Sequence, residues 1–183
     1  MPPAEHLDAG IVQLRRWSPD WALQLDAAIN ESQAELRRFM PWATETHSLA
    51  ETEAYIARSV EQWGTGEAFN YSMFLADAGD EADGRVVGSC GLMARMGPGV
   101  LEIGYWVHTA VAGRGIATAV ASALAAEGLL VPGIERVAIR HDVANLASGR
   151  VAAKAGFTQV GHIAQGAGGV GQTGPELVWE RRA

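Results

Sequence analysis

The chain has 183 residues, and its 21 acidic and 14 basic residues give a formal net charge of −7 at pH 7. Its composition, 48% hydrophobic and 19% charged, is that of a folded globular protein, and its length suits one domain over residues 1–183. The acidic balance argues against nucleic acid as a partner. The single cysteine excludes a disulfide or multi-cysteine zinc site within the chain. The lack of a signal peptide or membrane-length apolar stretch favours a cytoplasmic protein.

The first third of the sequence predicts one strand and two helices. Residues 11–15 alternate in polarity, which is typical of a strand. Ser18 followed by Pro19 is a helix start, with Ser18 as the N-cap. Ser48 and Glu51 are spaced as a capping box, which places the start of a further helix there.

The pattern then changes to one of strands. Residues 69–76, 85–93 and 100–108 each read as a strand. A polar, glycine-containing turn separates the first two, over residues 77–84, and a Gly-Pro-Gly turn separates the last two, over residues 97–99. Short loops between successive strands predict an antiparallel meander.

The remaining residues predict helices and strands in alternation. An alanine-rich helix over 116–130 is followed by a strand over 134–140, a helix over 145–155 and strands over 157–164 and 176–180. A strand–helix–strand step within an otherwise antiparallel sheet gives an α+β fold. We expect a mixed, mostly antiparallel sheet of about seven strands flanked by helices.

A glycine turn precedes the alanine-rich helix, with the sequence Ala112-Gly113-Arg114-Gly115-Ile116-Ala117-Thr118. Glycines let the backbone approach a ligand closely, and the free N–H groups of a helix start bind anions. The turn therefore predicts a phosphate site, to which Arg114 could add a cation. The alternative is an ordinary glycine-containing turn.

A second glycine-rich stretch, residues 166–171, matches the literal spacing G-x-G-x-x-G of dinucleotide-binding proteins. That motif must be followed by a helix, but Pro175 and a predicted strand follow instead, and the chain ends at residue 183. We therefore interpret residues 165–174 as a hairpin loop near a substrate opening.

Asn145 and Ser148 lie three residues apart at the start of the last predicted helix, so their side chains can share a face. Each could instead serve only as a cap. The helix continues to a Gly-Phe pair, Gly156-Phe157.

The glycine turn and the Asn145–Phe157 stretch together resemble the GCN5-related N-acetyltransferase (GNAT) superfamily. Residues 36–42, Leu-Arg-Arg-Phe-Met-Pro-Trp, and residues 102–107, Glu-Ile-Gly-Tyr-Trp-Val, are similar to the RimJ/RimL branch of ribosomal-protein N-terminal acetyltransferases. One departure is Ala112, where the superfamily usually has Gln or Arg.

The resemblance implies acetyl-CoA as co-substrate, without a metal. Its pyrophosphate would lie on the N–H groups from Gly113 to Thr118, and its pantetheine arm would pair with the strand bearing Val107. The cofactor-binding residues implied are Trp106, Val107, Gly113, Arg114, Gly115, Ile116, Ala117, Thr118, Asn145 and Ser148. The resemblance also implies an oxyanion donor in the backbone near Trp106 or Val107.

The resemblance implies two catalytic side chains. Because an alkylammonium is not a nucleophile, a base must take its proton, and Glu102 is the candidate, directly or through water. Ser148 would assist the leaving thiolate. The alternatives are a solvent-facing strand glutamate and a simple helix cap.

The acceptor is expected to be a primary amine, in the first place a protein N-terminal α-amine, by analogy with the family. Trp42 and Tyr71 could line its site by stacking or cation–π contact, or could be core residues. One alternative acceptor is a small amine (an aminoglycoside, a polyamine or an aminoacyl-type antibiotic). Another alternative is a non-catalytic CoA-binding module, because Ala112 departs from the usual residue of the superfamily. Exposed edge strands are compatible with a homodimer.

Overall fold

The structure is a computed structural model that describes residues 1–76, 85–164 and 174–182. The turn expected at 77–84 lies outside the described residues, as does the glycine-rich segment up to residue 173. The strands are β1 (His6–Asp8), β2 (Val12–Arg16), β3 (Ala68–Leu75), β4 (Val86–Met93), β5 (Val100–Val107), β6 (Arg136–Asp142), β7 (Thr158–Ile163) and β8 (Glu176–Arg182). The helices are α1 (Ala22–Phe39), α2 (Leu49–Thr65), α3 (Ile116–Gly128) and α4 (Leu146–Lys154), with 3-10 turns η1 (Pro19–Trp21) and η2 (Thr109–Val111).

Local sequence signals set the helix starts. The Ser18 side chain accepts a hydrogen bond from the Asp20 backbone N–H at 3.3 Å. Ser48 and Glu51 form both bonds of the predicted capping box at the start of α2. Both caps are confirmed, but the helix expected at Pro19 starts as the 3-10 turn η1 and becomes α-helical only at Ala22.

The strands form one sheet in the order β1-β2-β3-β4-β5-β6-β8-β7, in which only β5 and β6 are parallel. The α+β fold, the meander β3–β5 and the strand–helix–strand step β5-α3-β6 are confirmed. The sheet has eight strands among the described residues because β1, which was not predicted, pairs with β2. β1 has only three residues, so the alternation of polarity over His6, Leu7 and Asp8 is too short to predict a strand.

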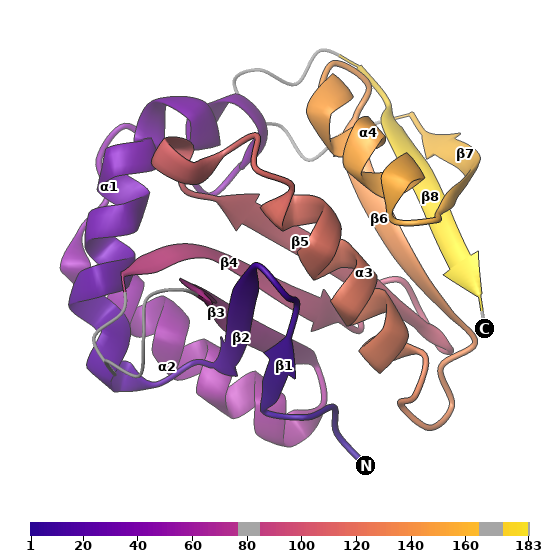
Figure 1. Ribbon diagram of the computed structural model, residues 1–183, viewed down its shortest axis with the longest axis horizontal. Coiled ribbons are helices and arrows are strands. Elements are labelled where there is room, and N and C mark those ends of the chain that lie inside the picture. Colours follow the sequence, from indigo (N-terminus) through magenta and orange to yellow (C-terminus); the bar gives the residue numbers. More distant parts are fainter. Residues whose placement is uncertain (77–84, 165–173, 183) are drawn as a thin grey trace.

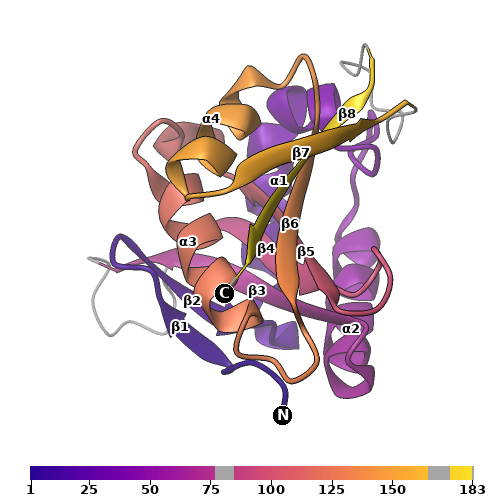
Figure 2. The same ribbon diagram turned by 90° about the vertical axis from the view of Figure 1, so that its right-hand side faces the viewer.

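Helices cover both faces of the sheet, and Figure 2 shows the strands between α3 and α4 on one side and α2 on the other. Under α3, side chains at four-residue spacing are buried: Ile116, Val120 and Leu124. On the opposite face, a second cluster joins α1 and α2 to the sheet through Leu25, Ile29, Ile56, Phe74 and Trp106. Two cores therefore fix α3 and α1 against the strands that carry the site.

Candidate active site

The sheet opens between its two parallel strands. Residues Val100–Glu102 of β5 pair with Arg136–Ala138 of β6, and the pairing stops there. Beyond that point β5 stays with β4 while β6 stays with β8, so the two strands diverge, as Figure 1 shows. The opening exposes backbone hydrogen-bonding groups that no described strand pairs with on that side.

The residues that face the opening follow from the strand register. The His108 N–H donates to the Val87 carbonyl of β4. Because backbone groups alternate in direction along a strand, the even-numbered residues of β5 bond to β4. Ile103, Tyr105 and Val107 therefore direct their N–H and C=O groups toward β6 and the opening.

The glycine turn leads from the opening into α3. Gly113 and Gly115 have φ of 79° and 85°, in the left-handed region that favours glycine. Gly115 is the N-cap of α3, and among the described residues no side chain caps the helix. The first N–H groups of α3 can therefore bind an anion, and Arg114 is exposed beside them. The side chain of Ile116 is buried in the core, so this residue could contribute only its N–H.

His108 anchors this turn to the rest of the fold. Its Nδ1 accepts a hydrogen bond from the Ala110 N–H at 3.1 Å. Its Nε2 lies 3.2 Å from Glu31 Oε2 on α1 and 3.1 Å from the Arg85 guanidinium, which itself pairs with Glu31. Sequence reasoning missed this cluster because its members are far apart in the chain and carry no shared motif.

At the start of α4, Asn145 Oδ1 accepts a hydrogen bond from the Ser148 N–H at 3.1 Å. Asn145 is therefore an N-cap, which was the alternative to a cofactor role. The Ser148 hydroxyl lies 2.9 Å from the hydroxyl of Tyr105 on β5. This pair reaches from β5 to α4, on the α3/α4 face of the sheet.

Glu102 lies at the last paired position before the opening, with only 3% of its surface exposed. Arg95 donates to both carboxylate oxygens, at 2.8 and 2.7 Å, and Arg140 donates to Oε2 at 2.9 Å. Burial alone would raise the pKa of Glu102, but the hydrogen bonds and charges of the two guanidinium groups outweigh it and hold the pKa below its ordinary value. The expected alternative, a solvent-facing glutamate, is wrong.

The arginines were not found from the sequence, although one signal was present. Ala138 of β6 pairs with Glu102, and Arg140 lies two residues further along the same strand. Side chains two residues apart on a strand share a face of the sheet. The pairing of Glu102 with Ala138 therefore places Arg140 on the same face as Glu102, and this pairing would have predicted their contact. Arg95 follows β4 in an irregular segment and gave no such signal.

Trp42 follows α1, is 45% exposed, and has its ring centroid 6.4 Å from that of Trp106. The Trp106 ring is 9% exposed and belongs to the core under α1 and α2. The backbone of Trp106 also bonds to β4, so the backbone of Val107, and not that of Trp106, faces the opening and can bind a cofactor.

Tyr71 occupies a different place from the one expected. It has 0% exposure, donates a hydrogen bond to the Ala4 carbonyl at 2.9 Å, and packs edge-on against Trp63. A side chain without exposed surface cannot contact an acceptor, and Tyr71 is a core residue. This corrects the expectation that it lines the acceptor site.

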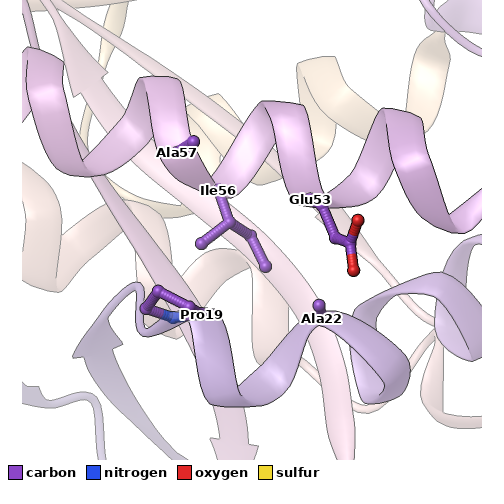
Figure 3. Close-up of a pocket in the computed structure, with 5 residues that line it drawn as sticks. All are labelled: Pro19, Ala22, Glu53, Ile56 and Ala57. Carbon is purple, nitrogen blue, oxygen red and sulfur yellow. The ribbon is translucent and has the colours of Figure 1, made fainter.

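A groove of about 280 Å³ lies between η1, α1 and α2, lined by Pro19, Ala22, Glu53, Ile56 and Ala57 (Figure 3). Ala22 begins the 18-residue helix α1, which is about 25 Å long at 1.5 Å per residue. Trp42 lies beyond the other end of this helix. The groove therefore lies at the opposite end of α1 from Trp42. Within the described ranges, no three His, Cys, Asp or Glu side chains are grouped to hold a metal ion. No helix of the described chain combines the length and apolar character needed to cross a membrane.

A mixed sheet that opens between two parallel strands, beside the start of a helix with a glycine N-cap, offers backbone groups to an extended ligand that carries phosphate. The chain belongs to the GNAT family, because the family model for the acetyltransferase (GNAT) domain matches residues 12–158. The protein is accordingly an acetyl-CoA-dependent N-acetyltransferase.

Solved structures with the same fold include three acetyltransferases. RimL, the ribosomal L7/L12 alpha-N-protein acetyltransferase, solved with coenzyme A, has a TM-score of 0.85 and 23% identity over 97% of this chain and 98% of its own. The microcin C7 self-immunity acetyltransferase MccE, solved with acetyl-CoA and AMP, has a TM-score of 0.83 and 19% identity over 95% and 93%. RimJ of Mycobacterium smegmatis, solved with CoA-disulfide, has a TM-score of 0.82 and 20% identity over 100% and 88%. At these identities the likeness concerns the fold. A comparison with curated protein sequences found no match.

The residues of this chain fit acetyl-CoA. The uncapped start of α3 offers N–H donors for a diphosphate, and the strand β5 offers unpaired backbone groups to an extended arm. These groups belong to the backbone, so a polar side chain in place of Ala112 is not needed to provide them.

Proposed function

We propose that this enzyme acetylates the α-amine at the N-terminus of a polypeptide. The observation that carries the proposal is the environment of Glu102, a carboxylate held ionised by two guanidinium groups. Such a carboxylate is a weak base. An α-amine, with a pKa of about 7.7–8.0, is partly neutral at neutral pH, whereas a lysine or polyamine nitrogen near 10.4 is almost fully protonated. A weak base therefore suits an α-amine better.

Two structural neighbours support this acceptor class. RimL is described as an α-N-protein acetyltransferase of ribosomal L7/L12, and its Salmonella typhimurium counterpart as modifying the N-terminal serine of that protein. The similarly close fold of MccE, a self-immunity enzyme against microcin C7, favours a small-molecule amine as the second candidate.

Three parts of the chain would hold the co-substrate. The N–H groups from Gly113 to Thr118, including those of Ile116 and Ala117, would bind the diphosphate, with Arg114 beside them. The backbone of Val107 would pair with the pantetheine arm, and Asn145 and Ser148 would border it from α4. Acetyl-CoA supplies an acetyl group activated as a thioester.

The side chains at the opening would then divide the chemical work. Glu102 would accept the proton of the acceptor ammonium, through a water molecule where the arginines occupy its oxygens. The Val107 N–H, which faces the opening, would stabilise negative charge on the carbonyl oxygen. Ser148 would donate a hydrogen bond to the departing sulfur, and Trp42 would contact the acceptor.

Matched peptides test the acceptor. One peptide has a free N-terminus and no lysine, and the other has a blocked N-terminus and one lysine. We expect kcat/KM to be at least about 100-fold higher for the first, in line with the difference in amine protonation. Mass spectrometry would locate the acetyl group. A preference for polyamines or aminoacyl nucleotides would favour the small-molecule function, and acetyl-CoA binding without any turnover would favour a non-catalytic module.

We also propose a homodimer formed in the cytoplasm. β7 is an outer strand of the sheet, and most of its residues are exposed, including Val160 at 55%. An open strand edge with an exposed apolar side chain is suited to pairing with a second copy. Light scattering is expected to give twice the chain mass for the native protein and the chain mass for Val160→Lys. A monomeric native protein would contradict this proposal.

A further inference from the structure

A pair of hydroxyl groups connects the two sides of the opening. Tyr105 belongs to β5 and Ser148 to α4, and their hydroxyl oxygens are 2.9 Å apart. The two residues are 43 positions apart in the chain, and β5 and β6 are no longer paired at this level of the sheet. The hydrogen bond thus fixes Ser148 relative to the strand that would hold the pantetheine arm.

The direction of this hydrogen bond follows from acidity. Burial raises the pKa of Tyr105 to about 12, so its hydroxyl stays protonated at neutral pH. A phenol is nevertheless a stronger donor than an aliphatic alcohol, and a serine oxygen is the better acceptor. In the favoured arrangement Tyr105 donates to Ser148, and the Ser148 proton is left to point elsewhere.

We propose that Tyr105 is a positioning residue that directs the hydroxyl proton of Ser148 toward the sulfur of the co-substrate. This inference rests on the role proposed above for Ser148. A residue at position 105 without a hydroxyl would leave the Ser148 hydroxyl free to rotate, and would lower the fraction of molecules in which it points at the sulfur.

The hydroxyl pair donates a hydrogen bond and not a proton. A thiol has an ordinary pKa of about 8.5, well below the value of about 12 for Tyr105. Transfer of a proton from either hydroxyl to a thiolate is therefore uphill. The expected gain is that of one oriented hydrogen bond, which strengthens as charge develops on the sulfur.

A double-mutant cycle tests the coupling between the two residues. We expect Ser148→Ala to lower kcat by about 10-fold or more and Tyr105→Phe to lower it by about 3–10-fold, both with little change in the KM for acetyl-CoA. In the Ser148→Ala background, Tyr105→Phe should have no further effect. Tyr55→Phe is the matched control, because Tyr55 pairs in the same way with Ser89, at 3.1 Å, on the other face of the sheet. Its kcat should remain that of the native enzyme.

Calorimetric binding of free CoA gives a readout that does not depend on turnover. A hydroxyl that donates to the sulfur stabilises the bound thiolate, so CoA affinity should rise as pH increases from 7 to 9, while desulfo-CoA affinity should not. Tyr105→Phe should reduce this rise.

The two proposals fail in distinguishable ways. If Ser148→Ala leaves kcat and the pH dependence of CoA affinity unchanged, the role of Ser148 is wrong. If Ser148→Ala has its effect but Tyr105→Phe is without effect or additive to it, only the positioning role of Tyr105 is overturned.

Discussion

Replacement of Gly115 by glutamate should weaken acetyl-CoA binding at least about 100-fold, equivalent to roughly 2.7 kcal/mol, while the fold is retained. Gly115 caps α3 with φ of 85°, and a Cβ built there meets nothing within 4 Å. A Cβ at this position therefore clashes with no described residue. The left-handed conformation costs roughly 1–2 kcal/mol, which a typical domain tolerates. The carboxylate would compete with the diphosphate for the first N–H groups of α3 and would repel it.

Two variants separate charge at the site from backbone strain. Gly133→Glu puts the same side chain at φ of 84°, also without neighbours within 4 Å, in the turn between α3 and β6. Gly115→Ala has the strain without the charge. Calorimetric titration with acetyl-CoA should give near-native affinity for both, and thermal unfolding should show similar losses of stability in all three. Near-native binding by Gly115→Glu would rule out the phosphate site at this turn.

The sequence allowed prediction of those features that depend on neighbours in the chain. The capping box at Ser48, the meander, and the glycine turn before α3 each rest on residues within a few positions of one another. Their physical cause is local: an N-cap oxygen, side-chain polarity that alternates with a period of two residues, or a left-handed backbone conformation. For that reason the predicted elements agree with the structure to within a few residues.

The environment of each candidate side chain could not be predicted in the same way. Tyr71 and Trp42 are both aromatic residues in the sequence, but the register of β3 buries the first, and the segment after α1 exposes the second. The pairing of Glu102 with Arg95 and Arg140 depends on three separate segments meeting at the end of a ladder. Such contacts depend on tertiary packing, which an individual sequence does not reveal without the fold.

The largest catalytic effect is expected for Glu102→Gln. An amide of the same shape cannot accept a proton, so kcat should fall by about 100-fold or more, with acetyl-CoA affinity unchanged because the diphosphate site lies in another segment. Stability should also fall, since Arg95 and Arg140 lose the charge they share. The loss should be smaller than the roughly 3–5 kcal/mol typical of fully buried pairs, because the Arg95 side chain is 55% exposed.

The matched control is Glu180→Gln. Glu180 accepts a hydrogen bond from Arg136 at 2.9 Å across the β6–β8 ladder, and β6 separates it from Glu102 in the sheet. This variant breaks a carboxylate–guanidinium pair in the same sheet, so its unfolding temperature should fall, but its kcat should stay near that of the native enzyme. Equal kcat for Glu102→Gln and the native enzyme would show that Glu102 has a structural role only.

Both the stability and the activity of the protein should depend on pH through the protonation of Glu102. Because the folded-state pKa of Glu102 is below its ordinary value of 4.5, its ion pairs stabilise the fold above that value, and this contribution is lost as the pH falls through the lowered pKa. Arg95→Gln removes two of the donors, so the pKa of Glu102 should rise. The acid limb of kcat, measured at saturating acceptor, should then move to higher pH in Arg95→Gln, and the same shift should appear in the acid unfolding midpoint. A limb that stays in place would mean that Arg140 alone sets the charge of Glu102, or that another group accepts the proton.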